Sequence, residues 1–260
     1  MDELKGRWSL VTGASSGLGV DFARELAARG SNLVLVARRE ERLQAVAAEL
    51  RQRHWVEAEA LAADLAAPGA PQQLFDRLQQ SGRQVDVLVN NAGLGLYGPF
   101  LEIPWQREAG MLQLDVVALV HLTRLFVPGM LQRGFGRVLQ VSSVGAFQPT
   151  PLYASYSAAK AFVLSYGEAL DFELRGTGVS CTVVAPGIAA TEFLQVSGQT
   201  PTLYQRLMLM TSAEVARVGV RALLRGRGSV VPGLANKLGA FSMRFMPRRL
   251  AAAVAWLTMR

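Results

Sequence analysis

The stretch that decides the fold is WSLVTGASSGLG, residues 8–19. A short apolar run, Trp8–Thr12, leads into a turn that contains Gly13, Gly17 and Gly19. Glycine lets a backbone turn tightly and approach a ligand closely, and the N-terminus of a following helix attracts phosphate. Such turns also occur in ordinary strand–helix connections. The position of this turn after the first strand favours a site for the pyrophosphate of a dinucleotide.

The residues after the turn have the pattern of an amphipathic helix. Leu18, Phe22 and Leu26 fall on one helical stripe, and Gly30 is a suitable residue to end the helix. We therefore expect a strand, a phosphate cradle and a helix. The candidate cofactor-binding residues of the cradle are Gly13, Ser15, Ser16, Gly17, Leu18 and Gly19.

The same alternation continues along the chain. Predicted strands are apolar nearly throughout, which is typical of strands covered on both faces; they are Trp8–Thr12, Leu33–Ala37, Ala58–Ala62, Val85–Asn90, Arg137–Ser142, Val179–Ala185 and Ser229–Val231. Helical patterns lie between them, at Leu18–Arg29, Arg39–Arg53, Arg107–Leu131 and Ser155–Arg175. This order predicts an α/β fold with a doubly wound, mainly parallel, seven-stranded sheet of Rossmann type and helices on both faces.

Composition fits one large catalytic domain, predicted for residues 1–235, with an extension at 236–260. Of the 260 residues, 50% are hydrophobic and 18% are charged, which argues against disorder. The first residues lack the apolar core of a signal peptide, and no stretch reaches the roughly 18 uninterrupted apolar residues of a membrane span. The single cysteine, Cys181, lies in an apolar run and is interpreted as a core residue. These features predict a reducing, cytoplasmic location.

The net charge of +7 is concentrated in the last part of the chain. Glu214 is the last acidic residue, and nine bases follow it: Arg217, Arg221, Arg225, Arg227, Lys237, Arg244, Arg248, Arg249 and Arg260. Pro247 is expected to start a helix with Leu250, Val254 and Leu257 on one stripe. We favour packing of this helix on the body with a basic outer face. Peripheral contact of 237–260 with an anionic membrane comes second, a partner helix or acidic carrier is open, and nucleic-acid binding is not expected.

The second predicted strand ends in Val36-Ala37-Arg38-Arg39. A carboxylate here would bind a ribose 2′-hydroxyl and repel a 2′-phosphate, whereas an arginine reverses that preference. Arg38 is the candidate for a charge-assisted contact with the phosphate, and Arg39 is expected to start the next helix. The sequence therefore favours NADP(H) over NAD(H).

Tyr156 and Lys160 lie four residues apart at the start of a long helical pattern, and so share one face. Two unit charges about 4 Å apart at an effective dielectric near 20 interact by roughly 4 kcal/mol. Lys160 is therefore expected to lower the pKa of Tyr156 by up to about 3 units and to fit it for general acid–base catalysis. Alone, the Tyr-x-x-x-Lys pattern is common on solvated helices.

Taken together, the motifs resemble the short-chain dehydrogenase/reductase family over about residues 6–235. They occur in the family's order and spacing, at Thr12–Gly19, Asp64-Leu65, Asn90–Gly93, Ser143, Tyr156–Lys160, Pro186-Gly187 and Thr191. The resemblance implies that Tyr156 exchanges a proton with the substrate oxygen and that Lys160 supports it and binds the nicotinamide ribose. Ser143, thirteen residues before Tyr156, would hydrogen-bond the substrate oxygen. The neighbouring Ser142 is expected to end the strand. Tyr153 does not fit the role of Tyr156, because no lysine lies four residues after it.

The resemblance also implies the cofactor contacts. Asp64 and Leu65 would meet the adenine, and Asn91, Ala92 and Gly93 would line the central part of the cofactor. The segment from Pro186 and Gly187 to Thr191 would hold the nicotinamide end, with the backbone of Ile188 near the carboxamide.

One position departs from the family's pattern. Members usually carry an asparagine in the helix before the active-site strand, where it helps to hold a water in a proton relay leading to Lys160. Here the position is Asp115. A carboxylate can serve through its main chain, change the pH profile, or pair with Lys160, so Asp115 is included as a relay candidate.

The substrate loops are rich in apolar residues and favour a hydrophobic carbonyl or alcohol, such as a steroid, acyl or aromatic compound. The substrate candidates are Leu94, Ser143, Phe147, Phe193 and Tyr204, and the region around 192–212 is a candidate lid. Core or dimer packing is the alternative for such residues. The family implies a homodimer or homotetramer. No residue cluster has metal-ligand spacing, so no metal is expected. The rival to an enzyme is a non-catalytic NADP(H)-binding sensor on the same fold, supported by Asp115 alone.

Overall fold

The computed structural model describes residues 4–187, 197 and 209–259. Its sheet has seven parallel strands in the order β3-β2-β1-β4-β5-β6-β7. The strands are β1 (Trp8–Thr12), β2 (Asn32–Ala37), β3 (Ala58–Ala62), β4 (Val85–Asn90), β5 (Gly136–Val141), β6 (Val179–Val184) and β7 (Ser229–Val230). The predicted doubly wound fold is confirmed, and the order of the strands changes direction between β1 and β4.

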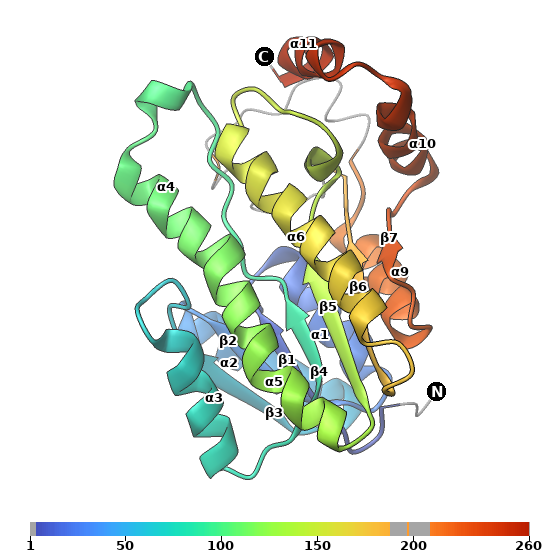
Figure 1. Cartoon of the computed structure of the whole chain (residues 1–260). Helices are drawn as coiled ribbons and strands as arrows, with labels where there is room; N and C mark the ends of the chain where they lie inside the picture. Colours follow the sequence, from blue (N-terminus) through green and yellow to red (C-terminus); the bar gives the residue numbers. More distant parts are fainter. Residues whose placement is uncertain (1–3, 188–196, 198–208, 260) are drawn as a thin grey trace.

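Helices cover both faces of the sheet (Figure 1). One core packs α1 (Gly17–Ala27), α2 (Glu40–His54) and α9 (Ser212–Leu224) against it. The other contains α3 (Ala70–Gln80) and α5 (Leu119–Gln132), with α6 (Ala154–Glu173) beside them. Because the strands are apolar on both sides, neighbours alternate between the cores: Val11 belongs to the first and Leu10 to the second.

The long helix predicted at 107–131 is present but contains an irregular turn. It consists of α4 (Trp105–Leu112), a π-helical turn, η2 (Gln113–Ala118), and α5. Asp115 lies in that turn and is fully buried. The combined helix, Trp105–Gln132, is long and apolar enough to cross a membrane by length and composition. Since its α5 part packs on the sheet and forms part of a core, we interpret it as a core helix.

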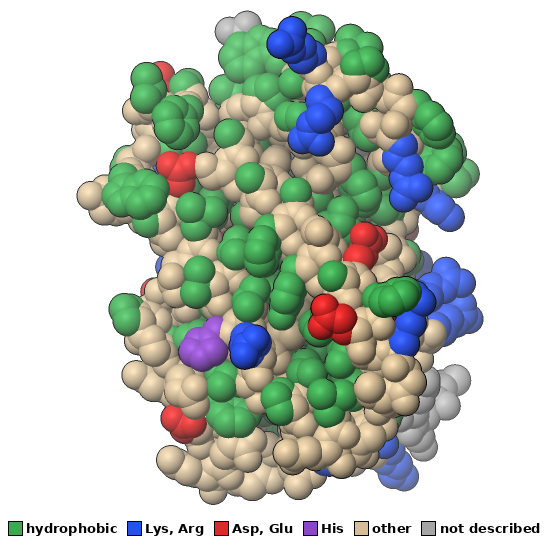
Figure 2. All heavy atoms as spheres, viewed as in Figure 1, with side chains coloured by type: hydrophobic (Ala, Val, Ile, Leu, Met, Phe, Trp, Pro, Cys, Tyr) green, Lys and Arg blue, Asp and Glu red, His purple; other side chains and the backbone are tan. Residues whose placement is uncertain are grey.

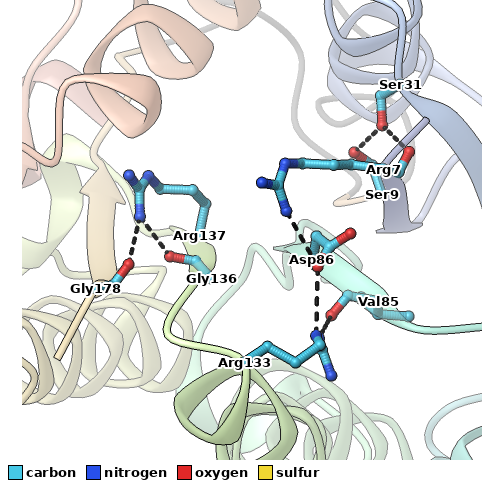
Figure 3. Close-up of polar contacts among 9 residues, drawn as sticks. All are labelled: Arg7, Ser9, Ser31, Val85, Asp86, Arg133, Gly136, Arg137 and Gly178. Carbon is cyan, nitrogen blue, oxygen red and sulfur yellow. Dashed lines mark hydrogen bonds and ion pairs between the residues drawn. The ribbon is translucent and has the colours of Figure 1, made fainter. Parts of the chain in front are cut away.

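Asp86, a buried carboxylate near the amino-terminal edge of the sheet, is paired with two arginines (Figure 3). Asp86 Oδ1 lies 3.6 Å from Arg7 Nη1 and 3.5 Å from Arg133 Nε. Arg133 also donates to the Val85 carbonyl at 2.7 Å. Cys181 is buried in the second core, and burial raises the pKa of its thiol to about 12, as expected of a core residue.

The C-terminal segment forms α10 (Leu234–Ser242), a 3-10 turn, η4 (Met243–Phe245), and α11 (Arg248–Met259), which lie beyond the carboxyl ends of the strands (Figure 1). The helix predicted after Pro247 is present. It packs on the body through Ala251 and Ala255, whereas Leu250 and Leu257 of the predicted stripe are exposed. Small side chains let the helix backbone approach the body closely, which leaves the larger side chains outside.

Candidate active site

A cavity of about 560 Å³ opens at the carboxyl edge of the sheet. That edge is where a doubly wound sheet binds ligands. Most of the predicted site residues that the structure describes line it: Gly13, Ser15, Ser16, Gly17, Leu18, Arg38, Asp64, Leu65, Asn91, Ala92, Gly93, Leu94, Ser143, Tyr156, Lys160, Pro186 and Gly187. Ile188, Thr191, Phe193 and Tyr204 lie outside the described residues.

The glycine-rich turn is tied to the end of β4. The Thr12 hydroxyl accepts hydrogen bonds from the backbone of Asn91 at 3.0 Å and of Ala92 at 2.9 Å, and the Asn91 side chain donates to the Thr12 carbonyl at 2.9 Å. Gly13 has φ +67°, and a Cβ there would lie 2.8 Å from Asn91 Nδ2. A Cβ at Gly19 would overlap the Gly13 carbonyl oxygen. Gly19 therefore packs the turn against its own helix and does not line the cavity.

The N-terminus of α1 faces a site with room for an anion. Ser16 is the N-cap residue but makes no side-chain capping hydrogen bond, and the first turn of α1 carries no acidic residue. The first backbone N–H groups of a helix have no partner within the helix, so a phosphate is well placed to accept from them. The turn fits the pyrophosphate of a nicotinamide dinucleotide.

Arg39 makes contacts that the sequence did not indicate. Its guanidinium donates to Ser15 Oγ at 3.2 Å and to Ser16 Oγ at 2.7 Å, and both Arg38 and Arg39 line the cavity. The expectation that Arg39 merely starts a helix was therefore incomplete. Arg39 is the N-cap residue of α2, but its side chain folds back to the cradle.

Asp64 and Leu65 border the cavity after β3. The Asp64 carboxylate accepts from the Ala66 backbone at 3.1 Å, and Leu65 is buried beside it. The pair thus offers a fixed carboxylate and an apolar wall at the end of the cavity nearest β2 and β3.

Tyr156 and Ser143 meet on the cavity wall. Ser143 is the N-cap residue of the 3-10 turn η3 (Val144–Phe147), and its hydroxyl accepts from the Gly145 backbone at 3.1 Å. Its side chain also forms a hydrogen bond with Tyr156, which lies in the first turn of α6. Two hydroxyl groups are therefore directed to one place in the cavity.

Lys160 is held near Tyr156 by two partners, the Asp115 carboxylate and the Val141 carbonyl. Its Nζ lies 2.9 Å from Asp115 Oδ2, donates to the Val141 carbonyl at 3.2 Å, and stands 5.6 Å from the centre of the Tyr156 ring. Asp115 Oδ1 also accepts from the Leu94 backbone at 2.8 Å. Of the alternatives for Asp115, pairing with Lys160 is the one that the structure shows.

The direction of the Tyr156 pKa shift contradicts the sequence-based expectation. Burial, as the largest cause, and the charge of Asp115 raise the pKa of Tyr156, while the hydrogen bond with Ser143 acts to lower it. The Lys160 ammonium, expected to act on Tyr156, is paired with the Asp115 carboxylate. Burial also raises the pKa of Asp115, against the effects of Lys160 and the Leu94 N–H.

The two neighbouring residues set aside in the sequence have other partners. Ser142 Oγ donates to the Lys160 carbonyl at 2.7 Å. Tyr153 is buried, and its hydroxyl shares a hydrogen bond of 3.1 Å with Ser197. Burial is the main cause that raises the Tyr153 pKa to about 12. Both contacts support the choice of Ser143 and Tyr156.

Of the two apolar substrate candidates that the structure describes, Leu94 and Phe147, one lines the cavity. Leu94 lines the cavity, but Phe147 ends η3 and is not among the lining residues, so the structure does not bring it to the site. Sequence reasoning missed a wall contributed by the C-terminal segment, through Asn236, Met243, Val254, Thr258 and Met259. In the part of the chain that is described, no three His, Cys, Asp or Glu residues lie together as a metal site would require.

The chain matches the family described as short chain dehydrogenase over residues 7–202. It belongs to the short-chain dehydrogenase family, and is an oxidoreductase that acts on CH–OH groups with NAD(P).

The chain is similar to a curated relative and to two solved structures over most of its length. The chain is 34% identical to the very-long-chain 3-oxoacyl-CoA reductase of Anas platyrhynchos over 232 residues, which cover 85% of this chain and 72% of the relative. A structure from a study of 7beta-hydroxysteroid dehydrogenase stereoselectivity has a TM-score of 0.88 at 28% identity, covering 97% of this chain and 98% of the other. A short-chain dehydrogenase from Sphingobium yanoikuyae in complex with NADPH has a TM-score of 0.83 at 33% identity, covering 92% and 93%.

Proposed function

We propose that the protein reduces the carbonyl group of a hydrophobic substrate with NADPH, with Tyr156 as the general acid. The observation that carries this proposal is the meeting of Tyr156 and Ser143 on one wall of the cavity whose far end is the glycine cradle. NADPH, when bound, supplies the hydride. The chain's own residues must then hold the carbonyl oxygen and deliver one proton to it.

Each side chain has a part in that proton transfer. Ser143 hydrogen-bonds the carbonyl oxygen and keeps it next to the Tyr156 hydroxyl, which donates its proton as the oxygen becomes an alcohol. The raised pKa of Tyr156 keeps the phenol protonated at neutral pH, which suits reduction. Lys160 and Asp115 lie beneath the phenol as a buried pair and set the field around it.

The preference for NADPH rests on the two arginines after β2. Arg38 and Arg39 both reach the cavity, and no carboxylate stands at the end of β2, where it would favour a free 2′-hydroxyl. The relative from Sphingobium yanoikuyae, which binds NADPH, supports the same choice.

The cavity lining and the relatives support the proposed substrate class. Leu94, Met243, Val254 and Met259 give the cavity an apolar wall beside the catalytic hydroxyls. Since the relative from Anas platyrhynchos is a very-long-chain 3-oxoacyl-CoA reductase, a long-chain 3-oxoacyl thioester is the first substrate to test, and a steroid ketone the second. The reducing, cytoplasmic location and the homo-oligomeric state remain predictions.

The experiment measures NADPH oxidation by the purified full chain against 3-oxoacyl thioesters of increasing chain length, steroid ketones and short polar ketones. We expect kcat/KM to rise with apolar length and to be higher with NADPH than with NADH. Tight NADPH binding without turnover of any carbonyl would instead favour the non-catalytic sensor.

A further inference from the structure

The C-terminal helices expose an unusual amount of apolar surface. Eight of the 17 exposed large hydrophobic residues in the described part of the chain lie between Leu234 and Leu257. Single exposed hydrophobic residues are normal on soluble proteins, whereas a cluster marks an interaction surface.

These side chains form two regular outward stripes. Leu234, Leu238, Phe241 and Phe245 follow the spacing of one helix face along α10 and η4, and Leu250 and Leu257, seven residues apart, share one face of α11. Phe245 and Leu257 are each 76% exposed, while Ala251 and Ala255 on the other face of α11 are at most 3% exposed. The apolar stripes therefore face solvent and are not part of the hydrophobic core.

The same surface is basic. Lys237, Arg244, Arg248 and Arg249 are exposed beside the stripes, and no acidic residue follows Glu214. Figure 2 shows hydrophobic and Lys or Arg side chains together over the region of α10 and α11. A second copy of this surface would bring like charges together, whereas an anionic partner complements them.

The surface is also fixed to the catalytic body. The Tyr97 hydroxyl donates to the Met259 carbonyl at 2.9 Å, and the inner side of the segment lines the cavity through Met243 and Thr258. A ligand on the outer face would thus lie within one helix layer of the active-site cavity.

We propose that this docking face, made of Leu234, Leu238, Phe241, Phe245, Leu250 and Leu257 with the surrounding bases Lys237, Arg244, Arg248 and Arg249, binds the surface of an anionic lipid bilayer. The apolar stripes enter the boundary between headgroups and acyl chains, and the bases contact anionic headgroups. Docking places the cavity next to the lipid phase in which apolar substrates dissolve.

The test is co-sedimentation of the full chain with phosphatidylcholine vesicles that contain phosphatidylserine, at low salt and at high salt. We expect binding to the anionic vesicles, weaker binding to pure phosphatidylcholine, and release by salt, because exposed charges are screened. A basic residue near such a surface strengthens binding by about fivefold. The triple variant Arg244→Glu, Arg248→Glu, Arg249→Glu should therefore bind at least about 100-fold more weakly.

Matched controls separate the docking face from net charge and from general apolarity. The triple variant Arg221→Glu, Arg225→Glu, Arg227→Glu changes the charge equally, on exposed residues outside the C-terminal helices, and should keep most of the binding. Phe245→Ser with Leu257→Ser should lose more than about tenfold, whereas Phe172→Ser, on exposed α6 surface, should change little. Circular dichroism checks that each variant is folded.

Three outcomes would overturn the proposal. They are no sedimentation with anionic vesicles at low salt, equal binding by the two triple variants, and self-association that Phe245→Ser with Leu257→Ser abolishes. Vesicle binding needs no turnover, so its failure is distinguishable from a failure of the proposed reductase activity.

Discussion

Lys160 Nζ lies 2.9 Å from Asp115 Oδ2, and both side chains are buried beneath the Tyr156 phenol. The ammonium of Lys160 and the carboxylate of Asp115 thus form a buried ion pair next to the Tyr156 ring. Burial is the main cause that raises the pKa of Tyr156, and the negative charge of Asp115 raises it further. The Tyr156 proton is therefore held more tightly than the Tyr-x-x-x-Lys spacing alone would indicate.

Asp115→Asn should shift the pH profile to lower pH. The change removes a negative charge that raises the pKa of Tyr156, so the pKa falls. Reduction needs the protonated phenol, and its alkaline decline should therefore begin at a lower pH; oxidation needs the phenolate, and its rise should also move to lower pH. Because Tyr156 remains, kcat at neutral pH should stay within about tenfold of the wild type.

The control for this variant is Asp86→Asn. Asp86 is, like Asp115, a buried carboxylate in an ion pair, but its partners are Arg7 and Arg133 and it lies at the amino-terminal edge of the sheet. It should lower stability and leave the pH profile of kcat/KM unchanged. An unchanged profile in Asp115→Asn, or complete inactivity of a folded Asp115→Asn protein, would contradict the role given to Asp115.

Gly19→Ala should destabilise the protein and weaken NADPH binding. Its Cβ would overlap the Gly13 carbonyl and lie 2.8 Å from Asn91 Nδ2, so the cradle must shift. Overpacking of this kind costs about 1–3 kcal/mol and should lower Tm by several degrees. Gly110→Ala in α4, where a Cβ meets nothing within 4 Å, should leave Tm equal or higher. Equal Tm values for the two variants would argue against the close packing.

Removal of Arg39 should reduce the discrimination between the two cofactors. If its guanidinium, held beside Ser15 and Ser16, also contacts the 2′-phosphate, Arg39→Ala loses a charge-assisted interaction of about 1.5–3 kcal/mol. We expect kcat/KM with NADPH to fall about 10- to 100-fold and that with NADH to change little. Arg38→Ala tests the other candidate, and Arg51→Ala, exposed on the same helix, should keep the wild-type ratio.

The sequence predicts the fold well because the fold depends on local patterns. Strands such as Asn32–Ala37 are apolar over most of their length. Gly13 and Gly17 have positive φ, and Gly19 lies too close to the Gly13 carbonyl for a side chain. The site residues that directly follow strands could be predicted as well, because the carboxyl ends of parallel strands lie at one edge of the sheet.

What could not be predicted depends on distant contacts. The Tyr156 pKa depends on burial and on Asp115, which is 41 positions earlier in the chain. In α11 the small side chain of Ala251 is buried and the larger Leu250 is exposed, the reverse of the general rule for apolar residues. The Arg39 contact with Ser16 joins the ends of two different strands.

The most direct test of the account compares Tyr156→Phe with Tyr153→Phe and with the wild type, measuring single-turnover NADPH oxidation and NADPH affinity by fluorescence. Tyr156→Phe removes the general acid and should slow turnover by about 10²- to 10⁴-fold with NADPH affinity retained. Tyr153→Phe removes the hydrogen bond with Ser197 and should stay within about tenfold of the wild type. Turnover by Tyr156→Phe close to that of the wild type would contradict the account.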